Sequence, residues 1–295
     1  MSVAIYYAIP GFFLTMFLEW LWSRRERTLW NGATAAGYAG RDTAASLAMG
    51  LGNVGIAGVV KLGTVGIWTG LHAFAPVKLP NAWWVWVLLF FADDLCYYAF
   101  HRASHEVRLF WAAHVNHHSS QHYNLSTALR QSWTTPLTGI PFWLPLPLLG
   151  FEPWMILTQQ AISLLYQYWL HTESIGRLGW LEALFNTPSH HRVHHGSNLE
   201  YLDRNHAGIL IVWDRLFGTF EPERAPVRYG LTTNIESFNP LVIAFHELGA
   251  IARDVRRAHN LREALGYVFG PPGWRPPATV AAPGTSAAAR TPGTP

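Results

Sequence analysis

Histidines recur along this chain at spacings that suit metal binding. They form three groups that read HxxxH, HxxHH and HxxHH, and one more histidine stands between the second and third groups. Residues three or four apart lie on one face of a helix, so each group can direct its imidazoles at one point. The nine residues are His101, His105, His114, His117, His118, His171, His191, His194 and His195.

Nine imidazoles are too many ligands for one metal ion. Structural zinc sites use about four protein ligands and catalytic zinc sites about three. The count therefore predicts a dinuclear site that keeps coordination positions open for oxygen or substrate. Imidazole binds zinc, copper, iron and nickel alike, so the ligand type alone does not name the metal.

The remaining histidines call for a different interpretation. Solitary histidines are more often hydrogen-bonded core or surface residues than ligands, and we expect this of His72, His246 and His259. His122 and His190 neighbour the groups but fall outside their helical spacing. For these two, contact with a ligand histidine or with substrate is as much expected as metal binding.

The composition indicates a membrane protein. Half of the residues are hydrophobic, 13% are charged, and 15 are tryptophan, which favours membrane interfaces. Residues 5–22 are long enough to cross a bilayer, and Arg24, Arg25 and Arg27 follow them, which predicts a retained anchor with a cytoplasmic basic end. A cleaved signal peptide is disfavoured, because the basic residues follow the apolar run.

Further apolar stretches predict a polytopic bundle. Residues 43–77 form one tilted span or a re-entrant pair, residues 82–100 form another span, and residues 135–170 form a hairpin that turns near Gly150. If Arg24 is cytoplasmic, the crossings bring all three histidine groups to the cytoplasmic side. The predicted fold is an all-α, polytopic membrane helical bundle with a cytoplasmic-side helical cap that holds the dinuclear site.

The domain organisation follows from the same patterns. Residues 1–270 are predicted to form a single membrane-embedded domain, and the Pro- and Ala-rich residues 271–295 a disordered tail. Residues 208–219 are too short to span and are expected to pack beneath the metal site or lie in the interface. Just before them stand Asp203, Asn205 and His206, which either cap that segment, the simpler interpretation, or reach the metal ligands.

Carboxylates near the histidines have candidate roles in the site. Asp93 and Asp94 lie inside an apolar span, where an ionisable side chain is costly. Asp94 stands two helical turns before His101, so we expect it to accept a proton from the second ring nitrogen of that ligand. Asp93 points elsewhere, and a packing role is equally expected for it. Asp94, Glu106 and Asp203 would also offset the charge of the metal ions.

Other chemistries are disfavoured by inspection. Both His105-Glu106 and His246-Glu247 begin an HExxH-like string, but Leu109 and Ala250 stand where the second histidine is needed, which argues against a zincin protease. The single cysteine, Cys96, excludes a disulfide framework and a protein-held iron–sulfur cluster. No nucleotide-binding glycine motif is present, and the net charge of +3 is too slight to suggest nucleic acid.

The histidine motifs resemble those of a known family. FHRASHE, HVNHHSS and SHHRVHHG are similar to the histidine boxes of the fatty acid hydroxylase and sterol desaturase superfamily of membrane di-iron oxygenases. HVNHHSSQHYNLSTALRQS, LLYQYWLHTE, NTPSHHRVHHG and DRNHAGILIVWDRLFGTFEPE resemble its ether-lipid-cleaving branch, the alkylglycerol monooxygenases. The resemblance runs from about residue 89 to 222.

The resemblance implies a ligand set. The eight boxed histidines would bind two irons, with His171 as an extra ligand. Gln167, one helical turn before His171, would supply a tenth ligand or hold a water molecule. Glu106 follows the first box as it does in the alkylglycerol monooxygenases, where a carboxylate beside the ligands suits the charge of the metals.

The resemblance also implies an activity. Members activate O2 at the two irons and hydroxylate or desaturate an unactivated C–H bond of a lipid that enters from the bilayer. The electrons come from a separate donor, either tetrahydrobiopterin or a ferredoxin or cytochrome. The substrate is open between an ether lipid, an ornithine lipid and a sterol. Composition favours a bacterial inner membrane with the metal site facing the cytoplasm.

Two alternatives remain at this stage. Aromatic residues near the histidines could line a lipid groove, although core packing explains rings at helical spacing equally well: Trp111, Tyr123, Trp133, Tyr166, Tyr168 and Trp169. A histidine-rich metal-binding or transport protein is a more distant class. Its ligands should recur through several spans, whereas these gather at the ends of spans. The sequence leaves the oligomeric state open.

Overall fold

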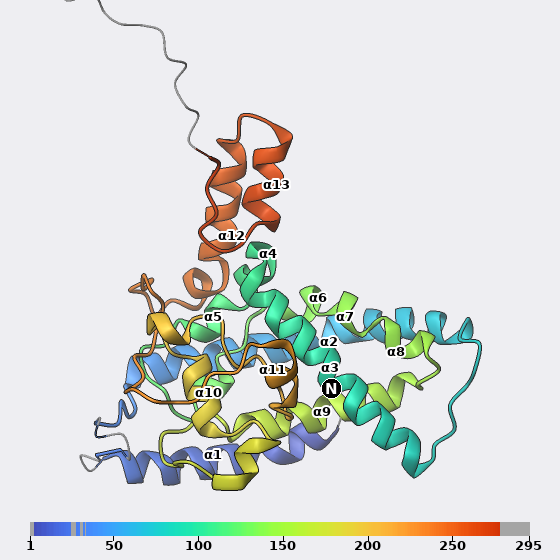
Figure 1. Cartoon of the computed structure of the whole chain (residues 1–295), viewed down its shortest axis with the longest axis horizontal. Coiled ribbons are helices and arrows are strands. Elements are labelled where there is room, and N and C mark those ends of the chain that lie inside the picture. Colours follow the sequence, from blue (N-terminus) through green and yellow to red (C-terminus); the bar gives the residue numbers. More distant parts are fainter. Residues whose placement is uncertain (1–2, 25–27, 30–31, 33, 278–295) are drawn as a thin grey trace, which may run out of the picture.

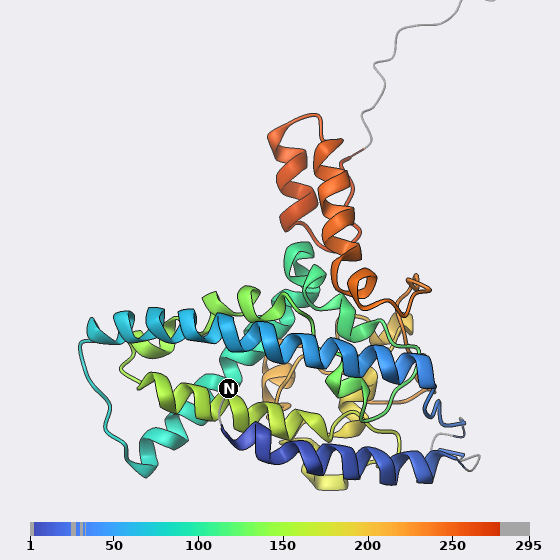
Figure 2. The same ribbon diagram turned by 180° about the vertical axis from the view of Figure 1, so that it is seen from behind.

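The chain is folded almost entirely into helices. The computed structural model describes residues 3–24, 28–29, 32 and 34–277, and in this part there is no strand beyond three isolated β-bridges, so the all-α prediction is confirmed. The elements, with η for 3₁₀-helices, are α1 (Val3–Ser23), α2 (Gly40–Ala73), α3 (Trp83–Glu106), α4 (Arg108–Ala112), α5 (Val115–His118), η1 (Thr127–Leu129), α6 (Thr135–Thr138), α7 (Ile140–Trp143), α8 (Pro145–Leu148), α9 (Pro153–Tyr168), η2 (Gly179–Ala183), α10 (Pro188–His194), η3 (Leu199–Tyr201), α11 (Val212–Phe217), α12 (Pro240–Arg256) and α13 (Leu261–Phe269). Figures 1 and 2 show α1 and α2 running along the longest dimension of the molecule.

Helices α2 and α3 are long and apolar enough to cross a membrane. Among the described residues these two meet that test, with mean hydropathies of 1.5 and 1.2. The stretch 43–77 lies mostly in the single continuous helix α2, so the alternative of a re-entrant pair is wrong. Both helices expose large apolar side chains, including Leu62 on α2 and Val87 on α3. The anchor expected at residues 5–22 lies in α1, and its crossing stays a prediction, as does the full polytopic arrangement.

Residues 135–170 form the expected hairpin, with one interrupted arm. Prolines remove backbone donors and clash with the preceding turn, and in this arm they accompany three short helices, α6, α7 and α8. The chain then turns at Gly150, whose φ is +94°, and returns as α9. A Cβ at Gly150 would lie 2.1 Å from the carbonyl oxygen of Val77, so only glycine fits this turn.

The largest apolar core lies where α2, α3 and the α6–α9 hairpin meet. It includes Trp68, Leu89, Trp143 and Ile156, all buried. Asp93 is also buried there, and its Oδ1 accepts a hydrogen bond from Trp143 Nε1 at 2.7 Å. The packing interpretation of Asp93 therefore describes what the structure shows.

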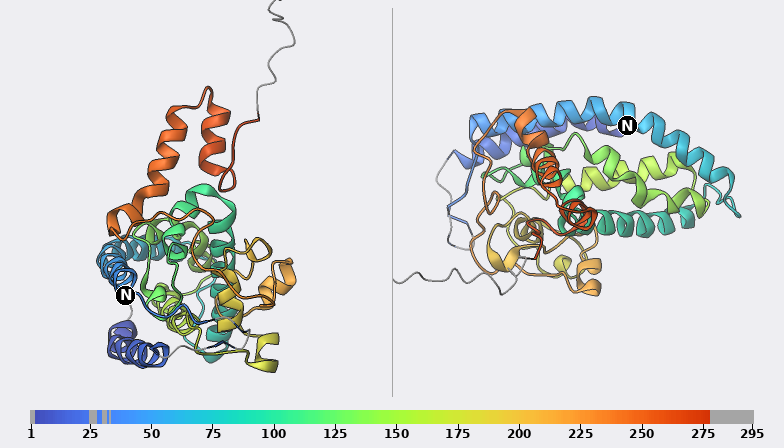
Figure 3. Two further views of the ribbon diagram at one scale, coloured as in Figure 1. Left: turned by 90° about the vertical axis from the view of Figure 1, so that its left-hand side faces the viewer. Right: turned by 90° about the horizontal axis from the view of Figure 1, so that it is seen from above.

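The C-terminal helices α12 and α13 form an antiparallel hairpin that projects across α2 (Figure 3). The described residues continue to 277, and Trp274 packs its indole ring against Gly266 of α13. The prediction that disorder begins at residue 271 is therefore wrong for residues 271–277, because this tryptophan gives them an apolar surface to bury. Residues 278–295, the rest of the predicted tail, lie outside the described residues.

Gly52 of α2 provides a test of this packing. A Cβ there would lie 2.4 Å from Trp133 Nε1, and that indole is already fixed by its hydrogen bond to the Met49 carbonyl oxygen. We expect Gly52→Ala to lower the free energy of unfolding by about 1–3 kcal/mol, because the ring must move from its packed position. Thermal unfolding in detergent measures this. Gly55→Ala is the matched control, since its Cβ would meet nothing within 4 Å, and equal melting temperatures for the two variants would contradict the expectation.

Candidate metal centre

The nine predicted histidines converge in two adjoining clusters. The first, the five-histidine cluster, consists of His101, His105, His114, His118 and His194. The second, the four-histidine cluster, consists of His117, His171, His191 and His195. Within each cluster the available ring nitrogens lie within 4.8 Å of one another, and every residue is buried. The sequence predicted one dinuclear site, and the structure brings all nine residues to two groups of the size that metal ions require.

Each histidine reaches its cluster through local helical geometry. His101 and His105 stand one turn apart near the end of α3. His114, His117 and His118 occupy the single turn of α5 and the residue before it, so their side chains fan towards both clusters. His191 and His194 belong to the short helix α10, which follows the extended residue Thr187 and has Pro188 in its first turn, a position that proline favours.

Backbone carbonyl oxygens orient four of these rings. Nδ1 of His101 donates to the carbonyl of His206 at 2.8 Å, and Nδ1 of His171 donates to that of Gln167 at 3.0 Å. His117 bonds to Arg130 at 3.4 Å and His194 to Arg204 at 3.0 Å in the same way. A carbonyl can only accept, so each ring carries its proton on Nδ1 and turns the lone pair of Nε2 into the cluster. Metal-binding histidines are oriented by such contacts.

The buried nitrogens fit a metal better than they fit one another. Nε2 of His117 and Nε2 of His171 lie 3.0 Å apart, but both rings already donate through Nδ1, so neither has a proton to share. Within the described residues, Nε2 of His105, His194 and His195 is buried with no hydrogen-bond partner. Facing lone pairs in a buried space need a cation between them.

Burial favours the neutral form of four of these imidazoles. It lowers the pKa of His171 to about 4 and, together with neighbouring histidines, lowers the pKa of His114, His191 and His194 well below its ordinary value. Metal ions bind the neutral imidazole, so the site is in its ligating state at neutral pH.

The loop that follows η3 supports the five-histidine cluster. Nδ1 of His105 lies 3.4 Å from Oδ1 of Asp203. The fully buried ring of His206 packs 5.0 Å from that of His105, and its backbone carbonyl holds His101. Asp203 and Asn205 both have positive φ angles, 57° and 56°, which asparagine and aspartate tolerate better than most residues. Contact with the ligands, not helix capping, is therefore what this segment provides.

The structure corrects the partner expected for Asp94. This buried carboxylate accepts from the backbone N–H groups of Ile209 and Leu210, at 2.8 and 2.9 Å, and from Trp213 Nε1. It does not reach His101, whose Nδ1 is taken by the His206 carbonyl. Asp94 therefore holds the 206–213 loop onto α3, and this loop in turn carries the carbonyl that orients His101. Residues 208–219 thus pack beside the metal site, which agrees with the first of the two placements expected from the sequence, packing beneath the site or lying in the interface.

The other predicted site residues lie at the margins of the clusters. The carboxylate of Glu106 bonds to Arg102 at 2.8 Å and is half exposed, so the structure places it on a surface ion pair beside the first histidine box. Nε2 of Gln167 donates to Ser163 Oγ at 2.9 Å, while its backbone carbonyl holds His171. The catalytic role of Glu106 and the ligand role of Gln167 stay predictions.

The histidines left open or expected to be structural lie outside both clusters. His122 Nδ1 donates to the Ala36 carbonyl at 3.0 Å, and His190 packs against Phe220. His72 bonds to the Gly150 carbonyl and His246 to the Ile243 carbonyl, as expected for structural residues.

Two of the aromatic residues singled out from the sequence contact the clusters. The ring of Trp111 lies 5.2 Å from that of His105, and the ring of Tyr123 lies 5.2 Å from that of His195. The Tyr123 hydroxyl donates to the Leu170 carbonyl at 3.0 Å. Trp133 instead packs on α2, and Tyr168 bonds to Thr15 of α1. Tyr166 bonds to the Asn186 carbonyl, and its ring packs against that of Trp169.

A buried ion pair between Arg192 and Glu223 supports α10, and the sequence analysis missed it. Nη2 of Arg192 and Oε2 of Glu223 lie 2.8 Å apart, and Nη1 of Arg192 also donates to the carbonyls of Thr172 and Ile175. Arg192 stands between His191 and His194 of the third histidine box. A charged residue inside a motif expected to be buried could have indicated this ion pair from the sequence. Such a charge requires a counterion from elsewhere in the fold.

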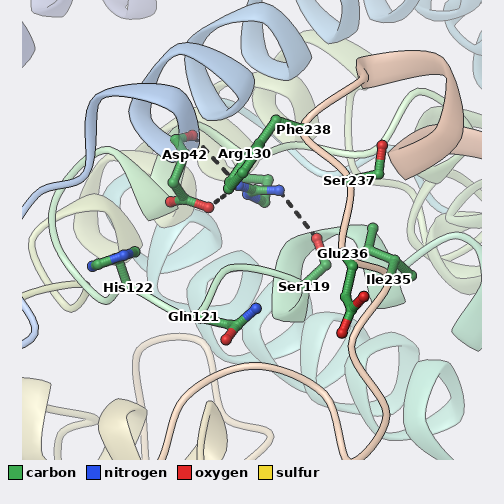
Figure 4. Close-up of a pocket in the computed structure, with 9 residues that line it drawn as sticks. All are labelled: Asp42, Ser119, Gln121, His122, Arg130, Ile235, Glu236, Ser237 and Phe238. Atoms are coloured by element: carbon green, nitrogen blue, oxygen red, sulfur yellow. Dashed lines mark hydrogen bonds and ion pairs between the residues drawn. The ribbon is translucent and has the colours of Figure 1, made fainter.

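A second buried ion pair joins Arg130 to Asp42 beside a cavity of about 210 Å³ (Figure 4). Figure 4 shows the Arg130 guanidinium between Asp42 and Ser119. The Arg130 carbonyl orients His117, so this pair fixes the loop behind the four-histidine cluster. The cavity is lined by Asp42, Ser119, Gln121, His122, Arg130, Ile235, Glu236, Ser237 and Phe238, and not by the clustered histidines.

Residues 86–219 match the family model described as fatty acid hydroxylase. This segment contains all nine clustered histidines, so the chain carries a fatty acid hydroxylase domain. The resemblance drawn from the histidine motifs is confirmed.

Curated relatives narrow the comparison. The chain is 46% identical over 211 residues to alkylglycerol monooxygenase of Homo sapiens. The aligned residues make up 71% of this chain and 46% of that protein. It is 39% identical over 266 residues to alkylglycerol monooxygenase of Xenopus tropicalis, covering 89% of this chain and 57% of the relative. Ornithine lipid hydroxylase OlsE of Rhizobium tropici is 31% identical over 165 residues, which is 55% of this chain and 50% of that protein. The chain thus spans about half the length of these relatives. No solved structure matches it.

The contact between His105 and Asp203 yields a prediction. Asp203→Gly removes the carboxylate while keeping a residue suited to φ of +57°. We expect metal affinity to fall about 10–100-fold, because the His105 ring loses the group that orients it, while the melting temperature of the metal-free protein stays unchanged. Competition with a chelator measures the affinity. Asp203→Asn, which retains an acceptor, is the control, and a glycine variant that binds metal as tightly as the asparagine variant would disprove the role.

Proposed function

We propose that this protein is a membrane-embedded, non-haem di-iron oxygenase that hydroxylates a C–H bond of a lipid. The observation that carries the proposal is the convergence of nine buried histidines into groups of five and four. Iron held by them would supply the activation of O2 that oxygen insertion into a C–H bond requires. The similarity to lipid monooxygenases and hydroxylases supports the same reaction class.

The chain's own residues have definable tasks in this reaction. His101, His171 and His194 present Nε2 lone pairs because backbone carbonyls hold their other nitrogen. The burial of all nine ligands excludes bulk water, which protects the oxidising site from side reactions. Trp111 and Tyr123 form an aromatic border on either side of the clusters.

An ether lipid is the substrate we favour, with hydroxylation at the carbon beside the ether oxygen. The support is that the human alkylglycerol monooxygenase is more similar in sequence than the ornithine lipid hydroxylase, with 46% against 31% identity, and aligns with more of this chain, 71% against 55%. Ornithine lipids and sterols, and desaturation in place of hydroxylation, are the alternatives of the same chemistry. The electrons would come from a separate donor, tetrahydrobiopterin or a ferredoxin or cytochrome.

Metal transport is a weaker candidate. A transport path needs ligands distributed along the spans, whereas these histidines lie at the C-terminal end of α3, in and around the short helices α5 and α10, and just after α9. We place α2 and α3 across a bacterial inner membrane with the clusters facing the cytoplasm.

Substitution of one ligand tests the reaction class. We expect His194→Ala to abolish lipid turnover and to lower the iron content of anaerobically purified protein from two per chain to about one, because the five-histidine cluster loses a buried ligand. Elemental analysis and lipid profiling of the expressing host measure the two effects. His259→Ala, at an exposed histidine outside the clusters, is the control and should match the unaltered protein.

The substrate is tested in the same preparation. Iron-loaded protein supplied with each donor in turn is given an alkylglycerol or an ornithine lipid. Release of a fatty aldehyde from the alkylglycerol would support ether cleavage, whereas a hydroxylated ornithine lipid alone would transfer the assignment to that substrate. Full turnover by folded His194→Ala protein would refute the oxygenase proposal.

A further inference from the structure

The α12–α13 hairpin carries an apolar stripe with no partner among the described residues. Leu261, Leu265 and Phe269 follow one another at intervals of four along α13 and are 73%, 47% and 56% exposed. Residues four apart lie on one side of a helix, so the three side chains form a continuous strip. Such a contiguous apolar surface usually marks an interaction site.

The opposite side of α13 is already covered. Trp274 lies against Gly266 and Gly270, where a Cβ would come within 2.4 and 2.9 Å of its indole. The Tyr267 ring also meets it edge-on at 5.2 Å. Within the described part of the chain these contacts cover one side of α13, and the stripe stays exposed on another.

A buried arginine fixes the hairpin to the metal-binding end of α3. Arg108 follows α3 by two residues and bonds to Glu247 and Asp254 of α12, both at 2.7 Å. Its backbone N–H also donates to the Gly270 carbonyl at 2.9 Å. The direction of the hairpin is thus set by the same segment that ends the first histidine box.

The hairpin joins α2 at a definite level. Ile243 and Ala244 of α12 pack against Ala45 and Met49 of α2. From these two positions to the end of α2 at Ala73 the helix rises about 36–42 Å at 1.5 Å per residue. The hydrocarbon core of a bilayer is about 30 Å thick, and about 40–45 Å with its headgroups. If α2 spans the core, the hairpin emerges in the headgroup layer.

Orientation and charge agree with that position. Figures 1 and 2 show the hairpin crossing the direction of α2, so it would run along the membrane surface when α2 spans. Its exposed charges are mainly basic. Residues 240–277 contain five arginines and three acidic residues, and two of the acidic residues, Glu247 and Asp254, are bound to Arg108. The third, Glu263, caps the start of α13. The arginines are Arg253, Arg256, Arg257, Arg262 and Arg275, of which Arg275 also lies 3.7 Å from Asp254.

We propose that the α12–α13 hairpin lies in the headgroup layer of the bilayer that α2 and α3 cross, with the Leu261–Leu265–Phe269 stripe inserted and the arginines bound to anionic phospholipids. An amphipathic helix with an apolar strip and basic flanks has this behaviour. The inference rests on the proposed membrane embedding. It gives the chain a second membrane contact that holds the metal centre at a fixed depth.

Fluorescent labels at three positions test the proposal in the full-length protein. Cys96 is first replaced by alanine, and single cysteines are then introduced as Leu265→Cys in the stripe, Val59→Cys on the exposed face of α2, and Glu200→Cys on the exposed surface of η3. Each labelled protein is placed in nanodiscs that hold one chain, made of phosphatidylcholine with or without phosphatidylglycerol. Both faces of a disc are open to an aqueous quencher, and quenching constants are compared.

We expect the label at residue 265 to be quenched several-fold less than the label at residue 200 in discs with phosphatidylglycerol. In discs of phosphatidylcholine alone the protection should be smaller. The variant R256Q/R257Q/R262Q should remove the difference between the two lipids, because the attraction of each arginine to anionic lipid is lost.

The outcomes separate this inference from the proposal on which it rests. Protection at residue 59 with full quenching at residue 265 would overturn the hairpin placement while leaving the span intact, and would assign the stripe to a protein partner. Full quenching at residue 59 would overturn the span itself. Equal protection at residue 265 in both lipids, unchanged by the triple variant, would overturn the role of the arginines.

Discussion

The central constraint on this structure is the burial of nine imidazole rings in two adjoining clusters. All nine rings are buried, and carbonyl oxygens accept from Nδ1 in four of them, so the Nε2 lone pairs of these four rings must face into the clusters. Such an arrangement is unfavourable without cations, because buried polar groups without partners cost free energy. Metal ions convert that cost into binding energy, which is why a protein can maintain this geometry.

The buried polar interactions around the clusters position the backbone carbonyls that orient the histidine rings. Asp94 binds the 206–213 loop, and that loop supplies the carbonyl for His101. Asp42 binds Arg130, whose carbonyl orients His117. Buried ion pairs add little net stability by themselves, but removing one partner is costly, so they specify a single loop conformation. Burying these charges costs free energy, and the result is a single, accurate placement of the ligands.

The apolar half of the molecule sets the position of this polar half. α3 exposes apolar side chains such as Val87 and Leu88 and carries His101 and His105 near its C-terminal end, so a helix that suits a bilayer also supplies two of the clustered histidines. In the proposed function, this arrangement would bring a lipid that diffuses in the bilayer to a metal centre assembled from polar loops. The projecting hairpin is anchored by Arg108 beside the first histidine box, which couples any surface contact to the position of the metal ligands.

The sequence by itself determined the set of nine ligands and the long apolar helices. Both are local properties, since ligand type, a spacing of three or four residues and a run of apolar residues are all read from neighbouring positions. It also located Asp94, Asp203 and His206 near the site. It assigned the wrong partner to Asp94, because helical spacing shows which residues share a face and not which distant backbone groups will meet that face.

Tertiary structure alone decided the division into five and four histidines and the partners of their second nitrogens. His101 meets a carbonyl 105 residues away, and Arg192 meets Glu223 at a separation of 31 residues. It also decided that residues 271–277 are packed, because the chain after α13 folds back and places Trp274 against Gly266 and Gly270. These outcomes depend on how loops close in space, and periodicity along the chain carries no information about that closure.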